Sequence, residues 1–228
     1  MNIEDLYSLY TKNYLVDTDT RTIRSTSIFF ALKGDNFNGN LFAKKALELG
    51  ASYCVIDEAE YEIKGATILV NNVLETLQSL ATYHRQKLGI PIIGITGSNG
   101  KTTTKELIHA VLNTQLKATA TRGNLNNHIG VPLTLLSFTN ETEIGIVEMG
   151  ANHQKEIEFL TIICEPDLGY ITNFGKAHLE GFGGEEGVIK GKSELYTYLK
   201  EHNKTALINP EDPIQLKLTS SLNRIVLN

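Results

Sequence analysis

The chain has 228 residues, which suits one large domain or two modest ones at roughly 150 residues per domain. Hydrophobic residues make up 41% and charged residues 21%, with 19 glycines and 5 prolines, which excludes collagen-like, disordered and low-complexity chains. Lys and Arg number 21 against 26 Asp and Glu, so the net charge of −5 provides no basic footprint for a nucleic acid or an anionic membrane. We therefore expect neither as a partner.

The first residues, MNIEDLYSLY, are acidic and lack the basic and apolar regions of a secretion signal, so we expect a cytoplasmic protein. The uncharged stretch 123–140 contains asparagines whose amides hydrocarbon would not accept, so no membrane span is expected. Cys54 and Cys164 lie in apolar patterns without CxxC spacing, which predicts two buried, reduced packing residues.

Short apolar segments alternate with helical periodicity in the first part of the chain. The pattern predicts strands at 26–32, 52–57 and 66–70, and helices at 41–50 and 73–88. The second helix is closed by Gly89 and Pro91, and we place a domain boundary there, between residues 1–88 and 89–228.

The second part continues the alternation with longer elements. It predicts strands at 91–96, 117–121, 143–150, 167–174, 205–210 and 223–228, and helices at 101–113, 131–138, 153–164 and 185–200. Strands that alternate with helices form a parallel sheet, which binds ligands at the carboxyl ends of its strands. The predicted fold is α/β: a small amino-terminal α/β domain followed by a parallel-sheet domain.

A glycine loop, GSNGKTT at 97–103, joins the strand at 91–96 to the following helix. Glycines let backbone N–H groups converge on phosphate oxygens, and the helix start adds its dipole. Lys101 would neutralise β/γ phosphates, and the Thr102 hydroxyl suits a bridging Mg²⁺, as in a P-loop ATPase domain. The usual motif has glycine where this chain has Ile95. A plain strand-to-helix turn is the alternative, but it leaves the Lys-Thr pair unexplained.

Other candidate ligands follow predicted strands. Glu148 ends an apolar strand, where a buried carboxylate needs a cation such as Mg²⁺, although it could simply face solvent. His178 lies in a glycine-flanked loop and is a candidate for metal or substrate contact, or a surface residue. Lys190 and Lys192 share a helix, and their spacing does not separate a functional lysine from a solvated one.

Four phrases, in order, resemble the Mur ligase family of peptidoglycan synthesis: GITGSNGKTTTKE, TRGNLNNHIGVPLTLL, VEMGANHQKEI and ITNFGKAHLEGFGGEEGVIKGKSELY. Upstream, DTR at 19–21 and STSIFFALKGDNFNGNLFAKKALELGA resemble the amino-terminal domain that holds the UDP end of a sugar nucleotide in this family. Two departures are Asn38-Gly39-Asn40, where relatives often carry Asp-Gly-His or Asp-Gly-Asn, and Lys155, where glycine is common.

The resemblance implies a site, residue by residue. The implied phosphate-binding residues are Gly97, Ser98, Asn99, Gly100, Lys101, Thr102 and Thr103. The implied substrate-binding residues are Thr20, Arg21, Asn38, Gly39, Asn40, Asn124 and Asn127. One Mg²⁺ would be held by Thr102 and Glu148, and a second by His178 and a carbamylated Lys192. Lys101, His178 and Lys192 are the implied catalytic residues.

The resemblance is strongest to the members that use ATP and two Mg²⁺ ions to join D-alanyl-D-alanine to UDP-N-acetylmuramoyl-tripeptide. The implied reaction passes through an acyl phosphate and yields ADP and phosphate. A carboxyl-terminal ligase domain is expected to be absent and the central domain incomplete, so we expect a monomeric fragment with little turnover. The alternatives are another ligase of the family, including folylpolyglutamate synthase, and a non-catalytic nucleotide-binding module. The DTR and NGN phrases argue against the folate enzyme, and His178 and Lys192 argue against the module.

Overall fold

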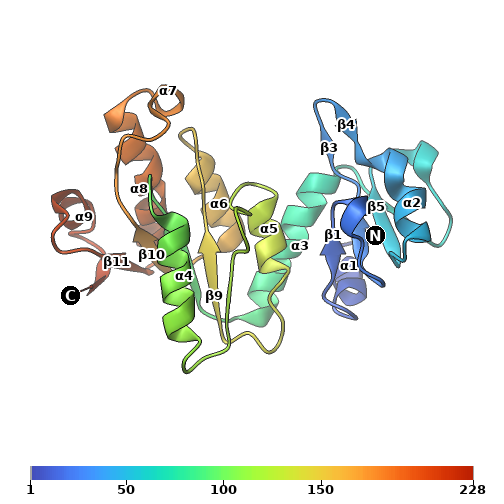
Figure 1. Cartoon of the computed structure of the whole chain (residues 1–228), viewed down its shortest axis with the longest axis horizontal. Coiled ribbons are helices and arrows are strands. Elements are labelled where there is room, and N and C mark those ends of the chain that lie inside the picture. Colours follow the sequence, from blue (N-terminus) through green and yellow to red (C-terminus); the bar gives the residue numbers. More distant parts are fainter. Residues whose placement is uncertain (1, 228) are drawn as a thin grey trace. The chain divides into compact units, whose positions relative to one another are not determined.

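The computed structural model describes residues 2–227 and divides the chain into two compact units, Met1–Lys87 and Leu88–Asn228 (Figure 1). Each unit has its own parallel sheet, with strands joined by helices. The predicted α/β class is therefore confirmed.

The amino-terminal unit has a four-stranded parallel sheet with the order β1-β2-β5-β6. Its elements are α1 (Ile3–Tyr10), β1 (Val16–Asp17), η1 (Thr20–Thr22), β2 (Ile28–Phe30), β3 (Lys33–Gly34), β4 (Phe37–Asn38), η2 (Gly39–Phe42), α2 (Ala43–Glu48), β5 (Tyr53–Ile56), η3 (Ala59–Tyr61), β6 (Thr67–Leu69) and α3 (Val73–Leu88). β3 and β4 form a separate antiparallel hairpin. The core packs Phe29, Cys54 and Ile56 of the sheet against alanines of α2.

Helix α3 shows how the periodic pattern becomes structure. Leu77, Leu80, Ala81 and His84 are all buried, and they recur at the three- and four-residue spacing of one helix face. An acidic residue in the first turn and two basic residues in the last turn complement the helix dipole.

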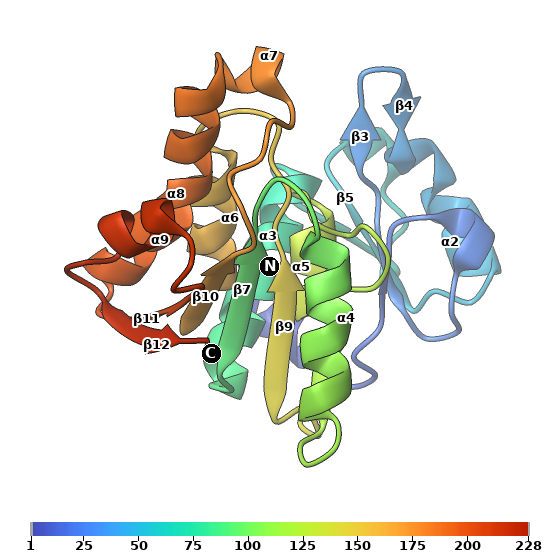
Figure 2. The same ribbon diagram turned by 60° about the vertical axis from the view of Figure 1, so that its left-hand side comes forward.

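The second unit has a six-stranded parallel sheet with the order β12-β11-β10-β7-β9-β8. Its elements are β7 (Ile92–Thr96), α4 (Lys101–Leu112), β8 (Ala118–Ala120), α5 (Gly130–Leu135), β9 (Ile144–Glu148), α6 (Glu156–Cys164), β10 (Leu168–Ile171), α7 (Leu179–Phe182), α8 (Glu185–Glu201), β11 (Thr205–Ile208), α9 (Pro213–Leu218) and β12 (Asn223–Val226). Helix α4 packs on β7, β8 and β9, whereas α6 packs between α5 and α8 (Figure 2). Because β7, β9 and β10 are adjacent, the loops at their carboxyl ends meet at one edge of the sheet.

The strands and helices expected from the sequence are all present, mostly with shorter ends. The structure also contains elements that the sequence pattern did not predict: α1, β1, the β3–β4 hairpin, α7 and α9. Helix α1 is capped by Asn2, whose side chain accepts the Asp5 N–H at 2.8 Å, and α9 is capped in the same way by Asp212. Both cysteines are buried and neither forms a disulfide, as expected. Among residues 2–227, no helix has the length and apolar character needed to cross a membrane.

Candidate functional site

The glycine loop lies at the carboxyl end of β7 and leads directly into α4. Gly97 has a φ of +137°, and a Cβ there would lie 2.0 Å from the Thr172 hydroxyl oxygen. Gly100 precedes the first residue of α4 with a φ of +77°. Side chains would clash at the first position and strain the backbone at the second, so the loop requires both glycines.

The loop is held in place by residues that follow β10. The Ser98 N–H donates to the Asn173 carbonyl at 3.1 Å, and the Asn99 N–H donates to the Asn173 side chain at 3.2 Å. The Thr172 hydroxyl donates to the Asn99 carbonyl at 2.6 Å. Thr172 and Asn173 were not singled out from the sequence, although their position near the carboxyl end of a predicted strand was the available signal.

Lys101 is the first residue of α4, and its ammonium folds back over the loop. It donates to the carbonyls of Gly97 at 2.9 Å and Ser98 at 3.3 Å. Burial lowers the pKa of Lys101, and the charge of Glu148 opposes that shift. The first N–H groups of a helix lack acceptors within the helix, so a cation beside them makes this corner attractive to an anion.

Thr102 and Glu148 meet across the gap between α4 and β9. The Thr102 hydroxyl donates to Oε2 of Glu148 at 3.0 Å, and the Asn126 amide donates to Oε1 at 2.8 Å. Glu148 is only 1% exposed. A buried carboxylate held by neutral donors fits a divalent cation, whose preferred ligands are carboxylate and hydroxyl oxygens. Asn126 was missed, although it lies between the two asparagines that the resemblance implied.

A cavity of about 730 Å³ adjoins this corner. Its walls include Lys101, Asn127 and His178, three of the residues implied by the resemblance, together with Asn126, His128, Asn152, Gln154, Lys155 and Phe159. Asn127 also shapes the start of α5, because its side chain accepts the Ile129 and Gly130 N–H groups at 3.1 and 2.9 Å. Asn124 is exposed and is not among the lining residues of this cavity.

The structure separates the two lysines of α8. Lys190 is exposed, whereas Lys192 is 1% exposed, and its ammonium donates to the Ala151 carbonyl at 3.0 Å. Burial, together with the charge of Lys101, lowers the pKa of Lys192 to about 8. His178 is exposed and immediately precedes α7 with a φ of +55°. Lys192 therefore lies inside the wall that carries Ala151, and His178 lies on the open side of the cavity.

Conventional metal-binding clusters do not occur among residues 2–227: no group of three or more His, Cys, Asp and Glu side chains is arranged to hold an ion. A cation here would take Glu148, the Thr102 hydroxyl and oxygens from a bound phosphate. This requirement would couple metal binding to nucleotide binding.

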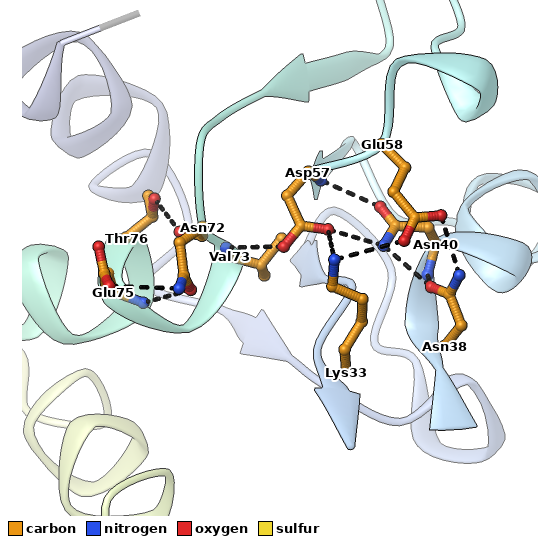
Figure 3. A network of polar contacts seen from close by, with 9 residues as sticks. All are labelled: Lys33, Asn38, Asn40, Asp57, Glu58, Asn72, Val73, Glu75 and Thr76. Atoms are coloured by element: carbon orange, nitrogen blue, oxygen red, sulfur yellow. Dashed lines mark hydrogen bonds and ion pairs between the residues drawn. The ribbon is translucent and has the colours of Figure 1, made fainter. Parts of the chain in front are cut away.

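The amino-terminal unit holds the Asn38-Gly39-Asn40 turn through a polar network (Figure 3). Asn40 is fully buried; its amide donates to Oδ1 of Asp57 at 2.9 Å, and its side-chain oxygen accepts the Asp57 N–H at 3.0 Å. The side chain of Asn38 accepts the Asn40 N–H at 2.9 Å and donates to Glu58 at 2.9 Å. The two asparagines thus satisfy each other and two acidic residues after β5.

Lys33 completes this network from the hairpin strand β3. Its ammonium pairs with Asp57 at 3.0 Å and with Glu58 at 3.3 Å (Figure 3). A Cβ on Gly39 would lie 2.4 Å from the Leu32 carbonyl oxygen. The turn is therefore fixed by close backbone packing as well as by hydrogen bonds.

Thr20 and Arg21 form η1 at the same carboxyl edge of the sheet. Asp19 caps this turn by accepting the Arg21 N–H at 2.9 Å. Its hydrogen bonds with the Arg21 side chain lower the pKa of Asp19 to about 2. The Arg21 side chain is 87% exposed, so its guanidinium is accessible, unlike the Asn40 amide.

A parallel sheet with a glycine loop at its carboxyl edge, followed by a Lys-Thr helix start and faced by a strand-end carboxylate, defines a nucleotide-binding domain of the P-loop type. A model described as "Mur ligase middle domain" matches residues 95–227, and one described as "Mur ligase family, catalytic domain" matches residues 13–88. The chain belongs to the Mur ligase family.

Several relatives share one printed name, "UDP-N-acetylmuramoyl-tripeptide--D-alanyl-D-alanine ligase". The protein from Bacillus subtilis (strain 168) is 43% identical over 202 residues, which cover 88% of this chain and 44% of that protein. The protein from Escherichia coli (strain K12) is 38% identical over 197 residues, covering 86% and 43%. The crystal structure of MurF ligase from Thermotoga maritima in complex with ADP matches with a TM-score of 0.83 and 31% identity, covering 96% and 50%. The chain spans about half the length of these relatives.

Proposed function

We propose that this chain carries the nucleotide-binding and sugar-nucleotide-binding parts of an ATP-dependent ligase that joins D-alanyl-D-alanine to UDP-N-acetylmuramoyl-tripeptide. The observation that carries the proposal is the meeting of Lys101, Thr102 and Glu148 beside one large cavity. The named relatives support the same assignment. We take both proposed substrates from the name that these relatives share. We also propose that the protein is cytoplasmic and monomeric.

The proposed reaction has two steps. The terminal carboxylate of the peptide attacks the γ-phosphorus of ATP, which forms an acyl phosphate and releases ADP. The amine of D-alanyl-D-alanine then attacks the acyl carbon, so that an amide forms and phosphate and a proton leave. Phosphoryl transfer of this kind depends mainly on positioning and on stabilising charge.

In this proposal the glycine loop and the start of α4 hold the phosphates of ATP. The backbone from Gly97 to Thr103 surrounds them, and the Lys101 ammonium exchanges its two carbonyl acceptors for β/γ phosphate oxygens. The cavity beside Lys101 receives the attacking carboxylate. Asn127 and His178 line that cavity and orient the carboxylate. Asn124 does not line the cavity, so in this proposal it contacts the substrate from outside.

Two magnesium ions complete the proposed site. Thr102 and Glu148 would hold the first, because their oxygens already face each other at 3.0 Å. His178, on the open side of the cavity, and Lys192 would hold the second, which requires the modified end of Lys192 to extend past the wall that carries Ala151. When bound, Mg²⁺ supplies positive charge that offsets the negative charge on the transferring phosphoryl group.

The proposed modification of Lys192 is a carbamate. A neutral lysine amine attacks CO₂, a C–N bond forms, and one proton leaves, which converts a cation into an anionic oxygen ligand. The reaction needs the neutral amine, and a pKa of about 8 makes that form available near neutral pH. The burial of Lys192 within the wall that carries Ala151 favours it over the exposed Lys190.

For the amino-terminal unit we propose that Thr20 and Arg21 contact the UDP end of the sugar nucleotide. The exposed guanidinium of Arg21 suits a diphosphate. Asn38, Gly39 and Asn40 would shape the adjoining turn, since the Asn40 side chain is fully buried.

Thermal unfolding of the chain with separate ligands tests the proposal. A ligand at 100 times its Kd adds about 2.7 kcal/mol, which raises the midpoint of a chain this size by about 5–10 °C. We expect that shift with UDP-N-acetylmuramoyl-tripeptide and with Mg-ATP, a smaller one with UDP, and none with a folate polyglutamate. A shift with Mg-ATP alone would reduce the proposal to a nucleotide-binding module, and a shift with the folate would favour a different ligase of the family.

A further inference from the structure

Helix α4 carries a buried lysine that the proposed mechanism does not use. Lys105 is 0% exposed, although lysine is almost never fully buried unless it is paired. Its ammonium donates to the Thr121 carbonyl at 2.6 Å and pairs with Glu106 at 2.8 Å. Glu106 is 61% exposed, so the carbonyl is the partner that lies inside the protein.

Thr121 connects this lysine to the candidate metal site. It is 2% exposed and directly follows β8. Its hydroxyl oxygen accepts the N–H of Glu148 at 2.9 Å, and its own N–H donates to the Ile146 carbonyl at 2.9 Å. A continuous series of contacts therefore runs from the Lys105 ammonium through Thr121 to the backbone of the buried carboxylate.

Two residues on one face of α4 reach two neighbouring strands. Thr102 and Lys105 are three positions apart, so they lie on the same face of the helix. Thr102 contacts Glu148 at the end of β9, and Lys105 contacts the residue that follows β8. Together they fix the helix to the carboxyl ends of both strands.

Thr121 is also the last residue before the asparagine loop leaves the sheet. Within that loop, Asn126 returns to Glu148, with its amide 2.8 Å from Oε1 and its carbonyl 2.7 Å from the Gly150 N–H. The direction in which the chain leaves β8 thus determines whether Asn126 reaches the carboxylate. A lysine that holds the Thr121 carbonyl acts on both the backbone and the side-chain partner of Glu148.

Packing alone does not call for a charge at this position. An apolar side chain of similar length would fill the same space without the cost of burying an ammonium. The carbonyl it holds belongs to Thr121, one residue beyond Ala120, the last residue of β8 that pairs with β9 in the strand register. This location distinguishes Lys105 from a lysine that merely neutralises a surface carboxylate.

We propose that Lys105 is a positioning residue for the magnesium site: through Thr121 it places the Glu148 carboxylate and the Asn126 amide for a nucleotide-bound Mg²⁺. The inference rests on the proposed nucleotide site. Residues that orient a metal ligand without touching the metal typically change metal affinity by about 10–100-fold when they are replaced. The loss should appear in the metal-dependent part of nucleotide binding only.

Isothermal titration of the 228-residue chain with ADP, in EDTA and in Mg²⁺, measures that part as the ratio of the two dissociation constants. We expect Lys105→Met to reduce the ratio by at least about 10-fold. The ADP affinity in EDTA should stay within about twofold, because the phosphate loop is untouched. Lys117→Met is the matched control, since it removes a 68% exposed lysine that shortly precedes Thr121 and should leave both values unchanged.

A second pair of variants covers the case in which Lys105→Met does not fold. Thr121→Val removes the hydroxyl that accepts the Glu148 N–H, and Thr121→Ser keeps it. We expect the valine variant to lose the magnesium enhancement and the serine variant to retain it. The double variant of Lys105→Met and Thr121→Val should lose no more than the larger single loss, because both act in one series of contacts.

The outcomes separate the two proposals. If the unaltered chain shows no magnesium-dependent ADP binding, the proposed nucleotide site fails. If it binds and a folded Lys105→Met or Thr121→Val retains the full ratio, Lys105 supports only the fold and the inference is overturned. A lower unfolding midpoint with an unchanged ratio gives the same negative answer.

Discussion

The two units place their polar residues at the same structural position, the carboxyl edge of a parallel sheet, but use them differently. In the amino-terminal unit, Asn40 is fully buried and is committed to Asp57. In the second unit, Lys101, Asn127 and His178 line a cavity of about 730 Å³. A resemblance marks both sets as ligand-binding, yet burial separates residues that shape a turn from residues that face open space.

A binding motif therefore contains two kinds of residue: those that allow the backbone path and those with accessible polar groups. In GSNGKTT, Gly97 and Gly100 make the backbone path possible, whereas Lys101 and Thr102 are the residues that we propose contact a ligand. In Asn-Gly-Asn, all three positions serve the backbone path, because the central glycine has no room for a Cβ and the asparagines bond within the protein. The accessible chemistry at that edge belongs instead to Arg21.

Replacing Lys101, which lines the cavity of the second unit, should have the strongest effect on ligand binding. Lys101→Met removes the cation of the glycine loop, and hydrogen bonds to charged groups contribute roughly 1.5–3 kcal/mol. We expect Mg-ADP to bind about 10–100-fold more weakly by isothermal titration, with the unfolding midpoint of the free protein almost unchanged. Lys190→Met, on an exposed lysine, is the control that should bind normally. Normal binding by Lys101→Met would mean that the loop is only a turn.

The second prediction concerns the buried turn of the amino-terminal unit and its contribution to stability. Asn40→Ala deletes a buried amide that bonds with both the side chain and the backbone of Asp57, so we expect a loss of about 1–3 kcal/mol in the free energy of unfolding. Calorimetry should show this loss in the transition of the amino-terminal unit. Asn36→Ala, at an exposed position in the turn of the neighbouring β3–β4 hairpin, should change stability by less than about 0.5 kcal/mol. A stable Asn40→Ala that no longer binds the sugar nucleotide would instead make Asn40 a direct ligand.

Sequence patterns predicted most of the framework for a physical reason. Strands such as β7 and β9 are buried along their whole length, so they read as unbroken apolar runs. The unpredicted helix α1 has only eight residues, and the unpredicted strand β1 has two residues and offers no period to detect. Short elements acquire their structure from packing and capping, which a local pattern does not contain.

The residues of the candidate site also differ in whether a local sequence pattern could indicate them. Lys101, Thr102 and Glu148 were found because each stands at the end of a strand or the start of a helix, where its chemistry is unusual. Asn126, Thr172 and Asn173 were missed because their partners are distant in the sequence. Lys105 has the sequence context of an ordinary helical charge, and only the structure shows that its ammonium is buried on a carbonyl.

A smaller change in stability is expected at Lys155, which lines the cavity of the second unit. Lys155 has a φ of +72°, a left-handed conformation that costs a side-chain-bearing residue roughly 1–2 kcal/mol. Lys155→Gly removes that cost but adds freedom to the unfolded chain, so we expect a net gain of about 0.5–1 kcal/mol. The exposed ion pair between Lys155 and Glu158 contributes little to offset this gain. Calorimetry should place the gain in the second unit, and a loss there would show that the ion pair outweighs the strain.

The smallest expected effect is a pH dependence of the stability of the amino-terminal unit, to which the Asp57 carboxylate contributes. Burial of Asp57 disfavours its ionised form, but hydrogen bonds from Asn40, Lys33 and the Val73 N–H outweigh burial and lower the pKa of Asp57 below its ordinary 3.8. A carboxyl group with a lowered pKa in the folded state stabilises the protein above its unfolded-state pKa, and this stabilisation is lost as the pH falls through the folded-state value. The stability of the amino-terminal unit should therefore decline below about pH 4, and the decline should be shallower in Asn40→Ala, which lacks one of these hydrogen bonds. Calorimetry between pH 7 and pH 3 measures both slopes; parallel slopes would mean that Asn40 acts on the turn without stabilising the ionised form of Asp57.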